Sequence, residues 1–183
     1  MGYRHIDNLY KDQSILMFRE CFALEKIHGT SASVQWREGR VQLSSGGEKH
    51  ERFASLFDEA KLIEAFALIG HPFVVVYGEA YGGSQQAQKW RYGELLRFIA
   101  FEVAVGETWL AVPQAHDLVT KLGLDFVHYV KVSTDLTVLD AEKRRCVDSR
   151  ICARGLYVQP CCTFENRTNS PCAVRTEHVD SKA

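Results

Sequence analysis

The sequence of 183 residues lacks long apolar runs, since no stretch approaches the 18 consecutive apolar residues typical of a transmembrane helix. Its first residues also lack the apolar block of a secretory signal. An excess of charge of one sign is missing too, because 22 Lys and Arg face 23 Asp and Glu. We therefore expect a cytoplasmic protein with no membrane partner, in which any site for a polyanion is a local patch.

Internal repeats, low-complexity tracts and linkers rich in Pro, Gly and Ser are likewise missing. With 46% apolar residues, the chain can bury one substantial core but not two independent ones. We expect a single domain over residues 1–183, with no C-terminal accessory domain. The sequence carries no indication of the oligomeric state.

The six cysteines are too sparse for a disulfide-dense secreted domain, so we expect reduced thiols. Five of them crowd the C-terminal part and suggest a zinc site as an alternative, with His178 as a further ligand. Their spacings are irregular, and adjacent cysteines in a strand would point to opposite sides, so the pattern does not favour zinc. The five are Cys146, Cys152, Cys161, Cys162 and Cys172.

The apolar pattern predicts short strands joined by hairpins, with few helices between them. Strands are expected at Cys21–Ile27, Ser31–Arg37, Arg40–Ser44, Phe73–Tyr77, Arg97–Val105, Thr108–Val112, Phe126–Val130, Leu156–Val158 and Cys172–Arg175. Helices are expected over Glu48–Ile69 with a break near Asp58, over Ala115–Leu122 and over Asp140–Cys146. This order favours an α+β fold of mainly antiparallel sheets with flanking helices.

A lysine ends the first of these apolar strands. Lys26 closes the run that begins at Cys21, and Gly29 opens a turn three residues later. Such a lysine is held rigidly, where apolar neighbours can exclude water and favour the neutral amine that a nucleophile requires. On spacing alone, a solvated lysine at a strand end is the favoured interpretation.

The segment from Glu25 to Thr30, E-K-I-H-G-T, resembles motif I of the covalent nucleotidyltransferases, which include ATP-dependent RNA and DNA ligases and capping enzymes. Its histidine is similar to that of the RNA ligase 2 family of phage and editing ligases, where DNA ligases usually carry aspartate. The resemblance implies a nucleotidyltransferase domain with Lys26 as the catalytic nucleophile. It also implies a group of nucleotide-binding residues from the same segment, namely Glu25, Ile27, His28, Gly29 and Ser31.

Two further segments continue this likeness. Val75 to Gly83 is similar to motif III, in which a strand ends in G-E before an aromatic-glycine loop; we expect Gly78 and Glu79 in that loop. By position, the resemblance makes Glu79 a ribose contact and a metal ligand. Phe98 to Val103 resembles motif IIIa, which makes Phe101 the ring that stacks on adenine.

The C-terminal motifs depart from the family pattern. Motif IV of the family begins with glutamate, whereas this chain has Arg154 at the start of R-G-L-Y-V-Q-P. Arg154 cannot ligate a metal, but its guanidinium suits phosphate. In motif V, only Arg175 remains of two cations, and Ser45 stands where some relatives have arginine.

The resemblance implies a reaction in which Lys26 takes AMP from ATP, with Mg²⁺ or Mn²⁺, and AMP then passes to an RNA 5′-phosphate for strand sealing. ATP and RNA ends are the partners expected, and a separate RNA-binding partner is an option. The basic clusters at 89–92 and 143–145 either meet RNA or form a solvated face. The alternative function is a degenerate nucleotide- or RNA-binding module that has lost turnover.

Overall fold

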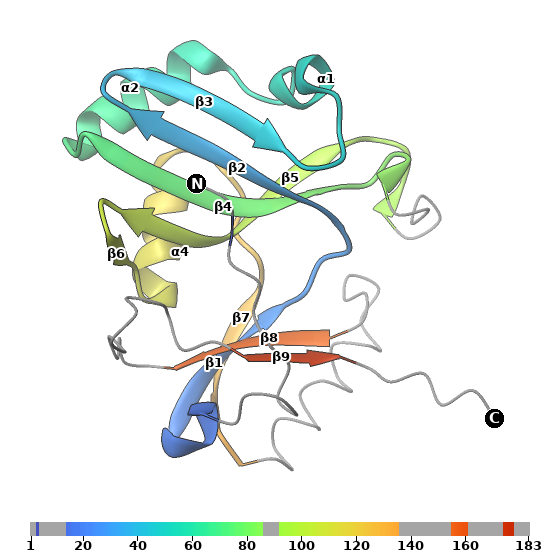
Figure 1. Ribbon diagram of the computed structural model, residues 1–183, viewed down its shortest axis with the longest axis vertical. Coiled ribbons are helices and arrows are strands. Elements are labelled where there is room, and N and C mark those ends of the chain that lie inside the picture. Colours follow the sequence, from blue (N-terminus) through green and yellow to red (C-terminus); the bar gives the residue numbers. More distant parts are fainter. Residues whose placement is uncertain (1–2, 4–13, 86–91, 136–154, 161–173, 178–183) are drawn as a thin grey trace. The chain divides into compact units, whose positions relative to one another are not determined.

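A computed structural model describes residue 3 and residues 14–85, 92–135, 155–160 and 174–177 of the chain (Figure 1). These residues divide into two compact units, one formed by residues 1–27 with 128–183 and the other by residues 28–127. Each unit contains one sheet, and all the strand pairs within the two sheets are antiparallel. The predicted α+β class with mainly antiparallel sheets is therefore confirmed.

The unit of residues 28–127 contains a five-stranded sheet in the order β3-β2-β4-β5-β6 (Figure 1). Its strands are β2 Gly29–Arg37, β3 Arg40–Ser45, β4 Phe73–Tyr81, β5 Arg97–Val105 and β6 Thr108–Trp109. The turn between β2 and β3 has positive φ at Glu38 and Gly39, 48° and 84°. Two consecutive residues with positive φ match the twist of a tight hairpin.

Among the described residues of this unit, the helices are α1 His50–Ala54, α2 Glu59–Ile69 and α4 Val112–Lys121. The predicted break near Asp58 is confirmed, because the Asp58 carboxylate accepts a hydrogen bond from the Lys61 N–H at 3.2 Å and so caps α2. Gly70 ends α2 in the left-handed conformation, with φ of 73°.

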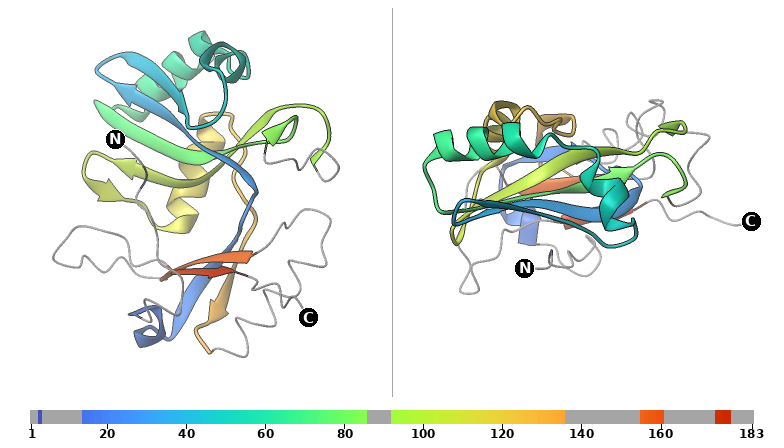
Figure 2. Two further views of the ribbon diagram at one scale, coloured as in Figure 1. Left: turned by 45° about the vertical axis from the view of Figure 1, so that its right-hand side comes forward. Right: turned by 90° about the horizontal axis from the view of Figure 1, so that it is seen from above.

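The helices pack on one face of the five-stranded sheet. Phe66 of α2 stacks on Trp36 of β2 with ring centroids 5.6 Å apart, and Val119 of α4 is fully buried in the same core. Two views of the chain show the helices gathered over this sheet (Figure 2). The sheet residues of this core are Ala32, Val34, Trp36, Val74, Val76, Ala80, Phe98, Ala100 and Val103.

Several predicted boundaries were wrong. Gly78 and Glu79 lie inside β4 rather than in a loop, because the ladder with β2 continues to Tyr81. The strand predicted over Thr108–Val112 ends at Trp109. The helix predicted from Ala115 begins instead at Val112, with Pro113 in its first turn.

The other boundary errors concern the chain around residue 126. The strand predicted over Phe126–Val130 is observed as β7 Tyr129–Ser133, while Phe126 makes only an isolated parallel bridge with Ala100. The predicted helix over Asp140–Cys146 lies outside the described residues, as do the five clustered cysteines and His178.

The other unit contains a four-stranded sheet in the order β7-β1-β8-β9. Its remaining strands are β1 Glu20–Glu25, β8 Gly155–Pro160 and β9 Val174–Glu177, and a 3₁₀ helix spans Ser14–Met17. The strand predicted over Cys21–Ile27 therefore ends two residues early. No helix in the described ranges is both long and apolar enough to cross a membrane.

Candidate active site

Lys26 directly follows the last residue of β1. The N–H of Glu25 donates to the carbonyl of His128 at 2.9 Å, and Glu25 lies opposite Leu156 of β8. The Glu25 side chain is only 8% exposed, and its burial raises the pKa of the carboxyl. Ile27 is buried, whereas Lys26 itself is half-buried. The nucleophile predicted from sequence thus extends from the end of a strand whose pairing fixes the preceding residue.

In the unit of residues 28–127, the start of β2 meets the end of β4, and Gly29 is the first residue of this strand rather than the start of the predicted turn. The Gly29 N–H donates to Oε1 of Glu79 at 3.0 Å across 50 residues of sequence. Ser31 lies directly opposite Glu79 in the β2-β4 ladder. The structure therefore brings together three of the residues that the resemblance selected, from two separate motifs.

Two glycines allow this close approach. A Cβ on Gly29 would lie 2.1 Å from the carbonyl oxygen of Ala80, and a Cβ on Gly78 would lie 2.5 Å from the ring of Phe98. Neither position can hold a side chain unless the ladder moves. The glycines of the two motifs are thus required by the packing around Glu79.

Glu79 lies on the face of the sheet opposite to the helices. Ala80 and Ala32 belong to the helix-covered core, and side chains alternate along a strand, so Glu79 and Ser31 face the other way. The same face carries Tyr77, which stacks on Trp109 with ring centroids 5.2 Å apart. Burial, and then the negative charge of Glu102, raise the pKa of Tyr77.

Phe101 occupies a β-bulge in β5. The register passes from Glu102 opposite Tyr77 to Ala100 opposite Gly78, so Phe101 is the additional residue of the bulge. Its side chain is half-buried. A bulge redirects a side chain without ending the strand, which suits a residue with a task other than core packing.

The aromatic-glycine loop after β4 brings in Tyr92, which we did not predict as a site residue. The backbone N–H of His28 donates to the Tyr92 hydroxyl at 3.2 Å, and the ring is only 9% exposed. The sequence suggested Tyr92 as part of a basic surface cluster; its burial shows that this interpretation was wrong for Tyr92. Residues 89–91 lie outside the described ranges. No pattern in the sequence links a tyrosine to a peptide group 64 residues away.

The altered motifs IV and V fall in the four-stranded unit. β8 pairs with β1, and Leu156 lies opposite Glu25. Arg154 is two residues before Leu156 in the chain and lies outside the described residues. Arg175 lies in β9, opposite Tyr157 of β8. The strand that carries motif IV is therefore a direct neighbour of the strand that ends before Lys26.

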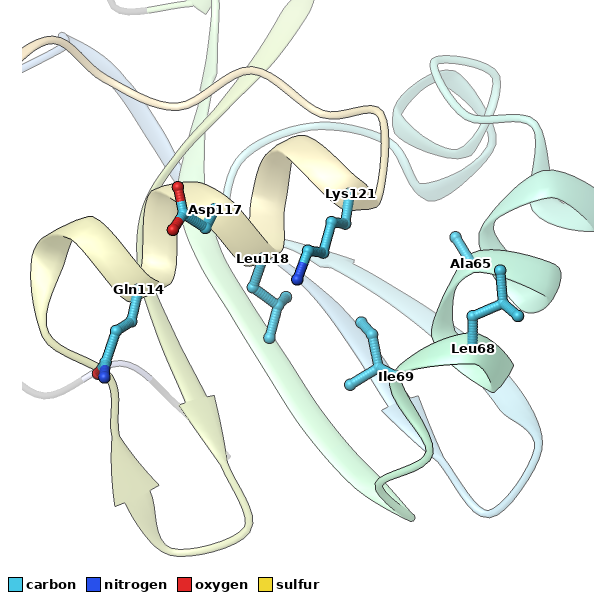
Figure 3. Close-up of a pocket in the computed structure, with 7 residues that line it drawn as sticks. All are labelled: Ala65, Leu68, Ile69, Gln114, Asp117, Leu118 and Lys121. Carbon is cyan, nitrogen blue, oxygen red and sulfur yellow. The ribbon is translucent and has the colours of Figure 1, made fainter.

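An open groove of about 600 Å³ lies on the helix-covered side of the five-stranded unit. It runs between α2 and α4, with Leu118, Lys121 and Ile69 along its walls (Figure 3). The predicted site residues do not line it, and Glu79 faces the opposite side of the sheet. The complete lining consists of Ala65, Leu68, Ile69, Gln114, Asp117, Leu118 and Lys121.

Glu79 can hold a divalent metal only together with ligands from a nucleotide. Among the described residues, no group of three or more His, Cys, Asp or Glu side chains is arranged to hold a metal ion. Mg²⁺ commonly needs just one or two carboxylates when nucleotide phosphates supply other ligands, and a carboxylate that accepts one hydrogen bond has further acceptor capacity. The residues present therefore fit a metal that arrives with a nucleotide.

Comparisons with known structures identify the fold as that of a nucleotidyltransferase. Three structures of Naegleria gruberi RNA ligase, two of variants with ATP and Mn and one with pyrophosphate, match with TM-scores of 0.71, 0.74 and 0.71. Each is 12% identical in sequence and is covered over 56% of its length, while 97% of this chain is covered. The chain thus spans little more than half the length of these ligases.

The family of the chain follows from its sequence. Residues 19–170 match the model of the RNA ligase family. Because this match spans most of the chain, the chain belongs to the RNA ligase family. No curated protein matches the sequence.

Proposed function

We propose that this protein is an ATP-dependent RNA ligase that forms a covalent lysyl-AMP intermediate on Lys26 and passes AMP to an RNA 5′-phosphate for strand sealing. Membership of the RNA ligase family supports the general activity. The contact between Gly29 and Glu79 carries the more specific proposal, because it joins the segment of the nucleophile to the carboxylate of a second motif.

In the first step, the neutral amine of Lys26 attacks the α-phosphorus of ATP. A P–N bond forms, the bond from the α-phosphorus to the bridging oxygen breaks, pyrophosphate leaves and the amine loses a proton. The RNA 5′-phosphate then displaces the lysine, and a 3′-hydroxyl finally displaces AMP. A divalent metal, Mg²⁺ or Mn²⁺, supplies charge neutralisation at the phosphates when bound.

The chain's own residues would prepare this reaction. Glu79 holds the Gly29 peptide and is the residue we propose for the ribose and the metal, while Phe101 is proposed to hold the adenine. Low-identity relatives with bound ATP, AMP or Mn support a nucleotide and a metal as ligands. We keep His28, Ser31, Glu25 and Ile27 as proposed nucleotide-binding positions.

A second candidate function is a nucleotide- or RNA-binding module without turnover. The arginine at position 154, where the family has a metal-binding glutamate, and the single cation Arg175 favour it. Arg154 would then contact phosphate. A single nucleotidyltransferase domain over residues 1–183, a separate RNA-binding partner and a cytoplasmic location also stay predictions.

The test is incubation of the full chain with ATP labelled at the α-phosphate, with Mg²⁺ or Mn²⁺, followed by denaturing electrophoresis. We expect label on the wild type and a loss of at least ~1000-fold in Lys26→Ala, because the attacking amine is gone. Lys49→Ala removes an exposed lysine and is the matched control. Label that survives in Lys26→Ala rejects the assignment, whereas ATP binding without label on the wild type supports the binding module.

A further inference from the structure

The groove between α2 and α4, which lies wholly within the unit of residues 28–127, has an apolar floor. Ala65 and Ile69 of α2 and Leu118 of α4 line it, and all three are half-buried and pack against the core of this unit. The apolar stripe of each helix therefore continues from the core onto the surface. The rim along α4 is polar and consists of the exposed residues Gln114, Asp117 and Lys121 (Figure 3).

Leu68 lies on the α2 side of this groove and lines it. It is 89% exposed, the largest fraction among the exposed large apolar side chains of the described residues. At this exposure it contributes little to the core beneath it, and its burial against another apolar surface would be favourable. The same patch of the molecule thus carries both a projecting apolar side chain and an apolar hollow.

α4 presents one charge of each sign beside the groove. Asp117 and Lys121 are one helical turn apart, and both are exposed. Figure 3 shows that the carboxylate and the amine are not directed toward each other. The carboxylate of Asp117 lies 3.7 Å from the ring of His116, and Lys121 forms no ion pair within the described part of the chain. An acid and a base are therefore both exposed at the rim of the hollow.

We propose that this groove is the interface between two copies of the chain, in which Leu68 of each copy enters the groove of the other and Asp117 of each pairs with Lys121 of the other. In a two-fold contact a patch faces its own copy, so it must supply both partners of every contact. This patch supplies a projecting leucine with an apolar hollow, and an acid with a base. A different partner needs only one member of each pair, whereas a second copy uses all four.

The anatomy of the patch fits such an interface. An apolar centre with a polar rim is the usual arrangement where two proteins associate. The interface leaves the candidate site of the same unit accessible, because Glu79 faces the opposite side of the sheet. The inference goes beyond the proposed ligase activity and does not rest on it.

The test is sedimentation of the full chain over a concentration series, which gives the Kd of the dimer. We expect the wild type to form species of one and two times the chain mass of 20.7 kDa. Leu68→Asp should raise the Kd at least ~100-fold, because by symmetry both leucines leave the interface and a charge replaces each. Leu95→Asp makes the same change at a 69% exposed leucine outside the groove, and its Kd should stay within about 3-fold of wild type.

Two outcomes of this experiment overturn the proposal. One is a wild type that stays monomeric up to about 1 mM, in which case the groove is free for a partner of another kind. The other is a Leu68→Asp variant that associates as tightly as the wild type, because the dimer would then use a different surface.

Exchange of the two charges tests the pairing itself. Asp117→Lys and Lys121→Asp each bring like charges together, so each should raise the Kd about 5-fold at low salt. The double variant Asp117→Lys with Lys121→Asp restores opposite charges and should return the Kd to within about 2-fold of wild type. Such a rescue cannot come from misfolding. A double variant that associates no more tightly than the single variants overturns the two-fold arrangement.

Discussion

The two units of the chain keep the family pattern to different degrees. The five-stranded unit packs α1, α2 and α4 against its sheet, and in it Gly29 of motif I bonds to Glu79 of motif III. In the four-stranded unit, the buried cluster consists of Ile15, Cys21 and Ala23 among the described residues, and the polar positions of motifs IV and V have changed. Strands pair in both units, whereas motifs IV and V, in the four-stranded unit, depart from the charged residues of the family pattern.

This difference shows that a fold and its chemistry depend on separate sets of residues. β8 pairs with β1 through backbone groups, so an arginine at position 154 in place of glutamate does not prevent the sheet from forming. Metal binding, by contrast, depends on the charge of one side chain. The four-stranded unit can therefore keep the strand pairing of β1 and β8 with an arginine at the position of the family's glutamate.

The largest effect is expected from a substitution that disrupts the five-stranded unit. In Gly29→Ala, the new Cβ would meet the Ala80 carbonyl at 2.1 Å, so we expect the free energy of unfolding to fall by about 2 to 3 kcal/mol. Urea denaturation measures it. Gly46→Ala is the control, because its Cβ would come no closer than 3.4 Å to the described atoms around it. Equal stability of the two variants would show that β2 and β4 do not approach as described.

The next largest effect is expected from a substitution that restores the family residue in motif IV. Arg154→Glu restores the family's carboxylate, and we expect lysyl-AMP formation at fixed ATP and Mg²⁺ to rise at least ~10-fold, equivalent to about 1.4 kcal/mol of barrier. The same labelling assay measures it. Arg150→Glu makes the same charge change four residues earlier and is the control. No gain in rate, with ATP binding intact, would mean that position 154 is not at the metal.

The smallest effect concerns pH and the end of β1. Because burial raises the pKa of Glu25 above its ordinary value of 4.5, the folded chain binds this proton more tightly than the unfolded chain. The free energy of unfolding therefore falls as pH rises from 4.5 through the raised pKa. Glu25→Gln cannot lose a proton, so its stability relative to wild type should increase across that window.

Urea denaturation of Glu25→Gln and wild type at a series of pH values measures this difference. Glu20→Gln is the control, because Glu20 lies at the exposed start of the same strand. A difference in stability that is constant with pH would mean that Glu25 is ionised as easily in the folded chain as in the unfolded one.

Much of the fold could be predicted because the apolar pattern and the turn residues act locally. The break at Asp58 and the hairpin at Glu38 and Gly39 are examples, since a cap and a tight turn each depend on adjacent residues. The end of β4 could not be predicted in this way. Gly78 looks like a loop residue by propensity, yet it remains in the strand because its neighbours on both sides pair with it.

The candidate site shows the same division. Lys26 and Glu79 could be selected because each stands in a short motif with a chemical reason for its residue type. Tyr92 could not, because its contact with His28 depends on the path of a loop that returns across 64 residues of sequence. The zinc alternative and the basic cluster at 143–145 concern residues outside the described ranges and stay untested.

The bulge in β5 has a consequence for how this protein can vary. Phe98 and Ala100 face the helix-covered core on one side of the bulge, and Val103 faces it on the other. All three can face the same core only because the bulge adds one residue between Ala100 and Val103. A change of residue type at Phe101 therefore alters no inward position. Selection can tune the size and polarity of this one ring independently of the stability of the sheet that carries it.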